Sequence, residues 1–258
     1  MLKKIMEKRR RQLENDKRSS SMPLLLEMID RSAQTISLSG ALGERGIGLI
    51  AEIKGSSPSN GSIRENVDPK EIALIYQQGG ASAISVLTEH HFFGGNISYL
   101  QSVREVTEIP ILRKDFIFDE FQLFEARAYG ADAVLLMNEV VSDKNELERL
   151  IHSAHRLGLE VLLESSNRDD LERSLETDAD VIGINNRDFD TLEVNIDSSI
   201  ELMSKISIDR PAISESGIFS RGDVQRMERA GFNGILVGTS LMKSQDIGKK
   251  IKELLGDD

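Results

Sequence analysis

Short apolar runs alternate with longer amphipathic, charged segments from Gly48 onward. Buried strands of a parallel sheet have such continuous Ile, Val and Leu character, and the charged segments between them are typical of surface helices. The runs are Gly48–Lys54, Ala83–Leu87, Ile109–Lys114, Ala133–Met137, Glu160–Glu164, Val181–Asn185, Pro211–Glu215 and Gly234–Gly238. Their mean spacing is about 27 residues, a normal length for one strand-helix unit. The pattern therefore predicts an α/β fold, a single (β/α)8 TIM barrel.

Local signals for helix ends support the barrel. Helices are predicted to stop at Gly80, Gly130, Gly158 and Gly231, because glycine readily adopts the backbone conformation that ends a helix. Each predicted helix start combines a capping side chain with a polar residue three positions later. The pairs are Asp68 with Glu71, Asp119 with Gln122, Ser142 with Asn145, and Ser220 with Asp223. An open doubly wound sheet is the rival fold, but no G-x-G-x-x-G motif follows the first strand.

The beginning of the chain has a different pattern. Leu2, Ile5 and Met6 recur at helical spacing among lysines and arginines, and a second apolar stretch spans residues 22–29. An amphipathic segment must bury its apolar stripe, so we expect residues 1–45 to form a helical extension that packs on the barrel mouth. Residues 46–258 would then form the catalytic barrel. We interpret the basic run from Lys8 to Arg11 as a solvated helix face.

Composition excludes several classes of function. The chain has 43 acidic and 32 basic residues and a net charge of −11, which argues against a nucleic-acid surface. No apolar run approaches the roughly 20 residues of a membrane span, and the basic start leads into no apolar signal core, so we expect a cytoplasmic protein. With no cysteine and four histidines, disulfides, thiolate catalysis and a metal site are not expected.

Polar side chains end several of the predicted strands. The loops after the strands' carboxyl ends build the active site of such a barrel. The side chains placed there are Glu52, Lys54, Lys114, Glu164, Asn185 and Glu215. One charged residue at a strand end is often only the first solvated position. Three carboxylates and two lysines that converge in a partly desolvated mouth would shift one another's pKa values, which predicts a general acid/base site.

A phosphate site is predicted beside these groups. Ser216 and Gly217 follow the seventh strand, and Gly238 and Thr239 follow the eighth. Glycine allows close approach of an anion to backbone N–H groups, and barrels often bind phosphate between these two loops. The alternative is that these glycines only make turns. Ser57 and its neighbouring hydroxyls after strand 1, and the fork of Arg187, suit phosphate oxygens.

These motifs, taken in order, resemble the indole-3-glycerol phosphate synthases. The resemblance covers the chain from the N-terminal extension to the eighth strand. Its motifs are Ala51-Glu52-Ile53-Lys54 with Ser57-Pro58-Ser59, Leu87-Thr88-Glu89 with Phe92-Phe93, Leu112-Arg113-Lys114-Asp115-Phe116, Gly183-Ile184-Asn185-Asn186-Arg187-Asp188, Ser214-Glu215-Ser216-Gly217-Ile218 and Gly238-Thr239-Ser240-Leu241-Met242. One departure is Gly55-Ser56, where many relatives carry a basic residue after the strand-1 lysine.

The resemblance implies a carboxy-lyase of tryptophan biosynthesis that needs no cofactor. It would close the indole ring on 1-(2-carboxyphenylamino)-1-deoxy-D-ribulose 5-phosphate and release carbon dioxide and water. By resemblance, Lys114 is the general acid of ring closure and Lys54 the partner of the substrate carboxylate. The other implied roles are acid/base chemistry for Glu164 and Glu52, positioning for Asn185 and Glu215, phosphate contacts for Ser57, Arg187, Ser216, Gly217, Gly238 and Thr239, and anthranilate contacts for Phe93, Phe116 and Leu136.

Two other functions compete with this interpretation. A phosphoribosylanthranilate isomerase would share the phosphate loops, but its usual catalytic cysteine has no counterpart in this chain. A non-catalytic barrel that binds a phosphorylated ligand would have no reason to keep both Lys114 and Glu164. The expected partner is an anionic, phosphorylated small molecule rather than a nucleic acid or a membrane, and we expect a monomer or weak homo-oligomer.

Overall fold

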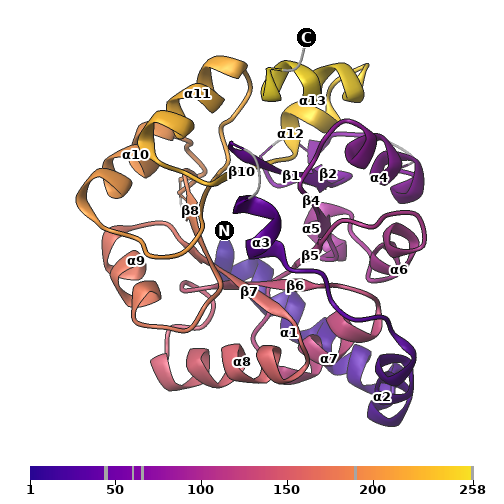
Figure 1. The fold of residues 1–258 in the computed structure, drawn as a ribbon. Helices are drawn as coiled ribbons and strands as arrows, with labels where there is room; N and C mark the ends of the chain where they lie inside the picture. Colours follow the sequence, from indigo (N-terminus) through magenta and orange to yellow (C-terminus); the bar gives the residue numbers. More distant parts are fainter. Residues whose placement is uncertain (44–45, 60, 65–66, 189–190, 257–258) are drawn as a thin grey trace.

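Eight parallel strands form a closed barrel, as predicted, with helices around it (Figure 1). The computed structural model describes residues 1–43, 46–59, 61–64, 67–188 and 191–256. The barrel strands are β1 (Gly48–Ile53), β4 (Ala83–Leu87), β5 (Ile111–Lys114), β6 (Ala133–Met137), β7 (Glu160–Ser165), β8 (Val181–Asn185), β9 (Ala212–Glu215) and β10 (Gly234–Val237). Neighbours follow the chain order, and β10 pairs with β1 to close the barrel.

Helices connect the strands and cover the outside of the barrel. They are α4 (Pro69–Gln78), α5 (His90–Phe93), α6 (Ser98–Arg104), α7 (Glu120–Ala128), α8 (Lys144–Arg156), α9 (Arg168–Leu175), α10 (Ile196–Lys205), α11 (Arg221–Ala230), α12 (Thr239–Met242) and α13 (Ile247–Leu255). A short hairpin, β2 (Ser56–Ser57) with β3 (Gly61–Ser62), follows β1. No helix among the described residues is both long and apolar enough to span a lipid bilayer.

The predicted helix boundaries are largely confirmed. The four glycines predicted at helix ends all have φ between 76° and 95°, a conformation that favours glycine. Asp68 and Asp119 cap α4 and α7, and Ser220 forms a capping box with Asp223 at α11. The prediction for α8 is wrong by one residue. Asp143, not Ser142, caps this helix by accepting a hydrogen bond from the backbone N–H of Glu146.

Alternate side chains of each strand enter two separate cores. On β6, Leu135 and Met137 point into the barrel and pack in its interior cluster. Val134 and Leu136 point outward and pack beneath the helices. This is the period-2 alternation of a strand, and it decides which residues of a strand can reach the mouth.

The N-terminal extension consists of three helices, and each packs on a different part of the barrel. They are α1 (Leu2–Ser19), α2 (Met22–Arg31) and α3 (Leu38–Gly43). In Figure 1, α3 lies across the near end of the barrel, and α1, drawn fainter, crosses behind it at the far end, which is the mouth. Helix α2 packs on α7 at the side. The expectation that all of residues 1–45 pack on the mouth is therefore wrong for α2 and α3, and residues 44–45 at the proposed boundary lie outside the described residues.

The interpretation of the basic run as a solvated face is wrong for its second residue. Arg9 is only 4% exposed and pairs with Asp115, which follows β5. Lys8 and Arg10 lie over the rings of Phe92 and Phe118. The helical stripe that α1 buries consists of Ile5, Arg9 and Leu13 at a spacing of four residues.

Helix α3 closes the end of the barrel opposite the mouth, which we call the floor, and its packing there predicts an effect on stability. Leu42 of α3 is buried, and its side chain lies against Gly48 and Gly234 at the starts of β1 and β10. We expect Leu42→Ala to lower the free energy of unfolding by about 2–5 kcal/mol, because it leaves a cavity among buried side chains. Urea unfolding measures this loss. The Michaelis constant should not change, since α3 lies at the opposite end from the mouth; a raised Michaelis constant would contradict this separation.

Candidate active site

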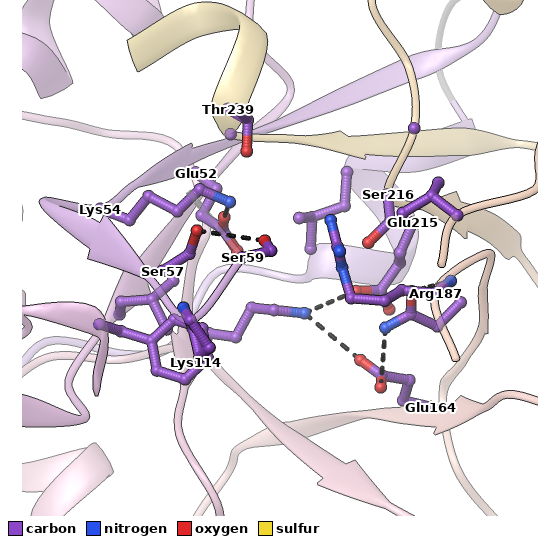
Figure 2. Close-up of a pocket in the computed structure, with 18 of the residues that line it drawn as sticks. Glu52, Lys54, Ser57, Ser59, Lys114, Glu164, Arg187, Glu215, Ser216 and Thr239 are labelled. Carbon is purple, nitrogen blue, oxygen red and sulfur yellow. Dashed lines mark hydrogen bonds and ion pairs between the residues drawn. The ribbon is translucent and has the colours of Figure 1, made fainter. Parts of the chain in front are cut away.

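A pocket opens at the carboxyl ends of the barrel strands, and the predicted site residues surround it (Figure 2). Every residue proposed for catalysis from the sequence lines this pocket: Glu52, Lys54, Lys114, Glu164, Asn185 and Glu215. The proposed binding residues that line it are Ser57, Phe93, Phe116, Arg187, Ser216, Gly217, Gly238 and Thr239. Closure of the barrel thus gathers side chains from positions 52 to 239 around one opening.

Leu136 is the predicted residue that the structure does not bring to the pocket. Its side chain lies in the outer core beneath the helices, because its neighbours in the strand face the interior. Leu135 and Met137 line the pocket instead. The sequence carried the signal for this correction. Met137 pairs with Glu164 on β7, and residues in register on neighbouring parallel strands face the same side.

Lys114 stands at the centre of the site, between two carboxylates. Its Nζ lies 2.6 Å from Oε2 of Glu215 and 3.4 Å from Oε2 of Glu164. The other oxygen of Glu164 accepts a hydrogen bond of 3.0 Å from the side-chain amide of Asn185. These groups come from β5, β7, β8 and β9, so the ends of four strands hold the amine in one place (Figure 2).

A second ion pair lies across the pocket, at the end of β1. Nζ of Lys54 is 2.5 Å from Oε1 of Glu52. Gly238, at the start of α12, leaves the space for this pair. A Cβ atom at that position would lie 2.3 Å from Oε1 of Glu52 and 2.9 Å from Nζ of Lys54. Glycine is required there because a side chain would collide with both members of the pair.

The buried charges shift the pKa values of the central pair. Burial by itself lowers the pKa of Lys114, but Glu215, Glu164 and Glu52 raise it overall, so the amine stays protonated. Burial raises the pKa of Glu215 to about 7, against the opposing effect of Lys114 and with a further rise caused by Glu164. Oε1 of Glu215 accepts no hydrogen bond within the described residues. Glu215 can therefore take up and release a proton near neutral pH.

The loop after β9 forms the opposite wall. Ser216 and Gly217 both have positive φ, of 68° and 82°. The side-chain amide of the buried Asn186 donates to the backbone oxygens of Glu215 and Ser216, at 3.0 and 2.9 Å, and so holds this unusual conformation. A Cβ atom on Gly217 would approach the side chain of Val194 to 2.6 Å. The loop is thereby packed closely beside the opening.

Arg187, which follows β8, places a positive charge beside the loop after β9. Its backbone N–H donates 2.9 Å to the side-chain oxygen of Asn185, and its Nη1 donates 2.9 Å to the backbone oxygen of Leu192. Its remaining guanidinium donors line the pocket together with Ser216 and Thr239 (Figure 2). This arrangement of an arginine, hydroxyls and glycine-rich loops suits a phosphate group.

An apolar side of the pocket lies opposite these cations. The rings of Phe93 and Phe116 have centroids 6.0 Å apart at an angle of 43°. Glu89 fixes the first ring, because its buried carboxylate accepts hydrogen bonds from the backbone N–H groups of His91, Phe92 and Phe93. The two rings contact each other and form one apolar wall, against which a planar aromatic group can pack.

Sequence reasoning missed several lining residues. Ile5 of α1 and Met1 line the pocket, as do Leu192, Val194 and Phe219 at its rim. Helical periodicity was a usable signal for Ile5, which lies on the buried face of α1, whereas Met1 precedes the helix and is 43% exposed. The rim residues lie in loops, where no periodicity indicates which side chain faces inward.

Comparison with protein families identifies a match over almost the whole chain. The family model described as indole-3-glycerol phosphate synthase matches residues 2–254. An indole-3-glycerol phosphate synthase of Dehalococcoides mccartyi is 42% identical over 246 residues, which cover 93% of this chain and 95% of the relative. One from Carboxydothermus hydrogenoformans is 45% identical over 210 residues, covering 81% of this chain and 79% of the relative.

Solved structures with lower sequence identity share the fold. A mutant tryptophan synthase alpha-subunit from Pyrococcus furiosus superposes with a TM-score of 0.63 at 16% identity, over 82% of this chain and 99% of that chain. Thiamine phosphate pyrophosphorylase from the same organism has a TM-score of 0.61 at 18% identity, over 85% and 96% of the two chains. These likenesses concern the barrel architecture alone.

The raised pKa of Glu215 predicts a pH-dependent contribution to stability. A carboxyl whose pKa is higher in the folded than in the unfolded state binds its proton more tightly when folded, so its stabilising contribution is lost as the pH rises. We expect the free energy of unfolding of the parent, relative to Glu215→Gln, to fall between about pH 4.5 and about pH 7. Urea unfolding of both proteins across this range measures the difference. A difference that stays constant or grows with pH would contradict the raised pKa.

Proposed function

The chain belongs to the indole-3-glycerol phosphate synthase family, and from this premise we propose how its residues carry out the reaction. It is a carboxy-lyase of tryptophan biosynthesis, which converts 1-(2-carboxyphenylamino)-1-deoxy-D-ribulose 5-phosphate to indole-3-glycerol phosphate. The reaction joins an aromatic carbon to the ketone carbon and releases carbon dioxide and then water. Each step needs a proton to be delivered or removed at a defined place, which is what the paired lysines and carboxylates of the pocket can supply.

The observation that carries the proposal is Lys114 held between Glu215 and Glu164 in the pocket. Ring closure turns the ketone oxygen into a hydroxyl. A protonated amine within hydrogen-bond reach stabilises the negative charge that develops on this oxygen and then donates its proton to it. Lys114 is the general acid of this step, and Glu215 and Asn185 orient the groups around it.

The two anionic ends of the substrate need separate cationic partners. Lys54 binds the carboxylate on the aromatic ring until it leaves as carbon dioxide. The aromatic ring itself packs against the apolar wall formed by Phe93 and Phe116, where Leu135 also lines the pocket. Because the protein carries a net charge of −11, the attraction for a ligand that is anionic at both ends must come from the local cations of the mouth. Gly55 leaves this field without the extra basic residue of many relatives.

The phosphate lies between the loops after β9 and β10. Arg187 donates to it from one side, and the backbone N–H groups near Gly217 and Gly238 donate from the other. The hydroxyls of Ser57, Ser216 and Thr239 complete the set. A phosphate held there fixes the far end of the substrate, which leaves the ketone carbon near Lys114 and the ring against the apolar wall of Phe93 and Phe116.

Dehydration completes the reaction and calls for an acid and a base. Loss of the hydroxyl requires a proton from a nearby acid, while a base removes a proton from the new ring system. Glu164 and Glu52 face the pocket from opposite strands, and they are the carboxylates suited to remove the proton from the ring system. Either Lys114 or Lys54 can supply the proton to the leaving hydroxyl, since both amines face the same opening.

Location, partner and oligomeric state complete the proposal. We propose a cytoplasmic enzyme whose partner is the phosphorylated substrate, acting as a monomer or weak homo-oligomer. That no cofactor takes part stays a prediction. Neither the isomerase nor the non-catalytic binder is retained, because the family match and the lysine–carboxylate cluster favour the synthase. Incubation of the purified protein with the substrate should produce indole fluorescence.

Removal of the charge on Lys114 tests the central role. We expect Lys114→Met, which keeps the aliphatic stem, to lower the chemical step by about 10²–10⁴ while substrate affinity changes less than about tenfold. Single-turnover measurements are required because product release can limit the steady state. Lys252→Met, at an exposed site on α13, is the matched control and should react at the parental rate. If the Lys114 variant keeps more than about a tenth of the parental step, Lys54 becomes the leading acid.

A negative side chain in the phosphate site tests the binding assignment. Gly238→Asp places a carboxylate where the dianion approaches and also collides with the Glu52–Lys54 pair. We expect substrate binding to be lost while the barrel remains folded, and inorganic phosphate at tens of millimolar to compete with substrate in the parent, since both occupy the same donors. Gly222→Asp, on the exposed start of α11, is the control and should bind normally. No competition by phosphate would count against this site.

A further inference from the structure

The residue after Lys114 is one of the most heavily bonded groups of the molecule. Asp115 is buried, and its two oxygens accept five hydrogen bonds. One oxygen accepts from Nε of Arg9 at 2.9 Å and from the backbone N–H of Phe116 at 2.8 Å. The other accepts from Nη2 of Arg9 at 3.1 Å, Thr88 Oγ1 at 2.6 Å and Arg113 Nη2 at 3.0 Å. Asp115 and Phe116 line the pocket, whereas Arg9, Thr88 and Arg113 are not among its lining residues.

Arg9 is the only one of these partners that comes from outside the barrel, within the described residues. It lies on α1 and holds Asp115 in the bidentate geometry that is the strongest arrangement for an arginine and a carboxylate. Asp16, seven residues further along α1, accepts a hydrogen bond of 3.0 Å from Nη1 of Arg9 and so orients the guanidinium. Ile5, on the same stripe of α1, and Met1, which precedes the helix, line the pocket.

The ion pair between Arg9 and Asp115 is buried, so removal of either residue leaves the other charge without its partner. Burial opposes ionisation of Asp115, but Arg9 and Arg113 together hold its pKa below the usual range, so it remains a carboxylate. A buried pair of this kind is destabilised strongly when one member is removed, because the other charge is left without its partner. Arg113, Thr88 and the N–H of Phe116 would still hold Asp115 after loss of Arg9. Without the two bonds from Arg9, however, these three bonds would set a different position of the carboxylate, and the adjoining residues would shift with it.

We propose that Arg9 is a positioning residue of the reaction, which fixes the Lys114–Asp115–Phe116 peptide through its two bonds to Asp115. Docking of α1 thereby does two things at once. It covers the mouth with Met1 and Ile5, and it sets the position of the general acid and of one aromatic wall. The inference rests on the role proposed above for Lys114.

The test separates this role from that of a simple tether. We expect Arg9→Met to lower the chemical step, measured by single turnover at saturating substrate, by about tenfold or more, since displacement of a catalytic group by about 1 Å can cost up to 10² in rate. Arg9→Lys keeps the charge but cannot span both oxygens, so its rate should lie between those of the parent and Arg9→Met. Arg11→Met is the matched control, because Arg11 is exposed on the same helix and pairs with Glu7. It should react as the parent does.

A tether would give a different result. If Arg9→Met raises the Michaelis constant but leaves the chemical step unchanged, α1 only covers the mouth and the proposal is wrong. Thermal unfolding confirms that each variant is folded at the assay temperature. Should Arg9→Met fail to fold, Arg9→Lys decides the question by the same criterion.

A double-mutant cycle shows whether Arg9 acts through Lys114. In a Lys114→Met background, Arg9→Met should cost much less in the chemical step than it does in the parent, since the group it positions is gone. An equal cost in both backgrounds overturns the proposal. If Lys114→Met itself reacts at the parental rate, the assignment of Lys114 fails and this inference fails with it. If only the Arg9 variants react at that rate, the assignment of Lys114 stands and the inference alone is wrong.

Discussion

The hydrogen bonds between β10 and β1 are the constraint on which the site depends. They close the sheet, so that strands near the two ends of the chain become neighbours. Gly238 can then lie against the Glu52–Lys54 pair, although almost 200 residues separate them in sequence. The same closure brings Lys114 within reach of Glu164 and Glu215. An open sheet would present these groups along an edge, where water would weaken every interaction among them.

The pocket is lined by three glutamates and two lysines, and their charges affect how readily its groups bind protons. Burial is the main reason that Glu215 holds a proton more readily than an ordinary glutamate does, and the neighbouring carboxylate of Glu164 adds to this effect. A bound substrate adds negative charge at both of its ends and draws on Lys54 and Arg187. We therefore expect the protonation of Glu215 to depend on whether substrate is bound.

The sequence predicted the barrel and most of the pocket because both depend on local periodicity. Eight apolar runs became strands within two residues of their predicted bounds, and alternation along β1, β5 and β7 placed Lys54, Lys114 and Glu164 toward the mouth. Leu136 was misplaced because the same alternation was not applied to β6. The burial of Arg9 could not be predicted, since its partner lies 106 residues away and helical periodicity does not distinguish a charged residue that meets a buried carboxylate from one that faces water.

Helix α3 has a consequence for the order in which the molecule folds. Its side chain Leu42 contacts the starts of both β1 and β10, so its final binding surface exists only once the last strand has joined the first. A segment translated early must therefore wait for residues 234–237 before it can complete the floor of the barrel. During synthesis the interior side chains at that end stay accessible to water and to chaperones until the chain is almost finished. We therefore expect closure of the seam and docking of α3 to be a late, shared step of folding that joins the beginning of the chain to its end.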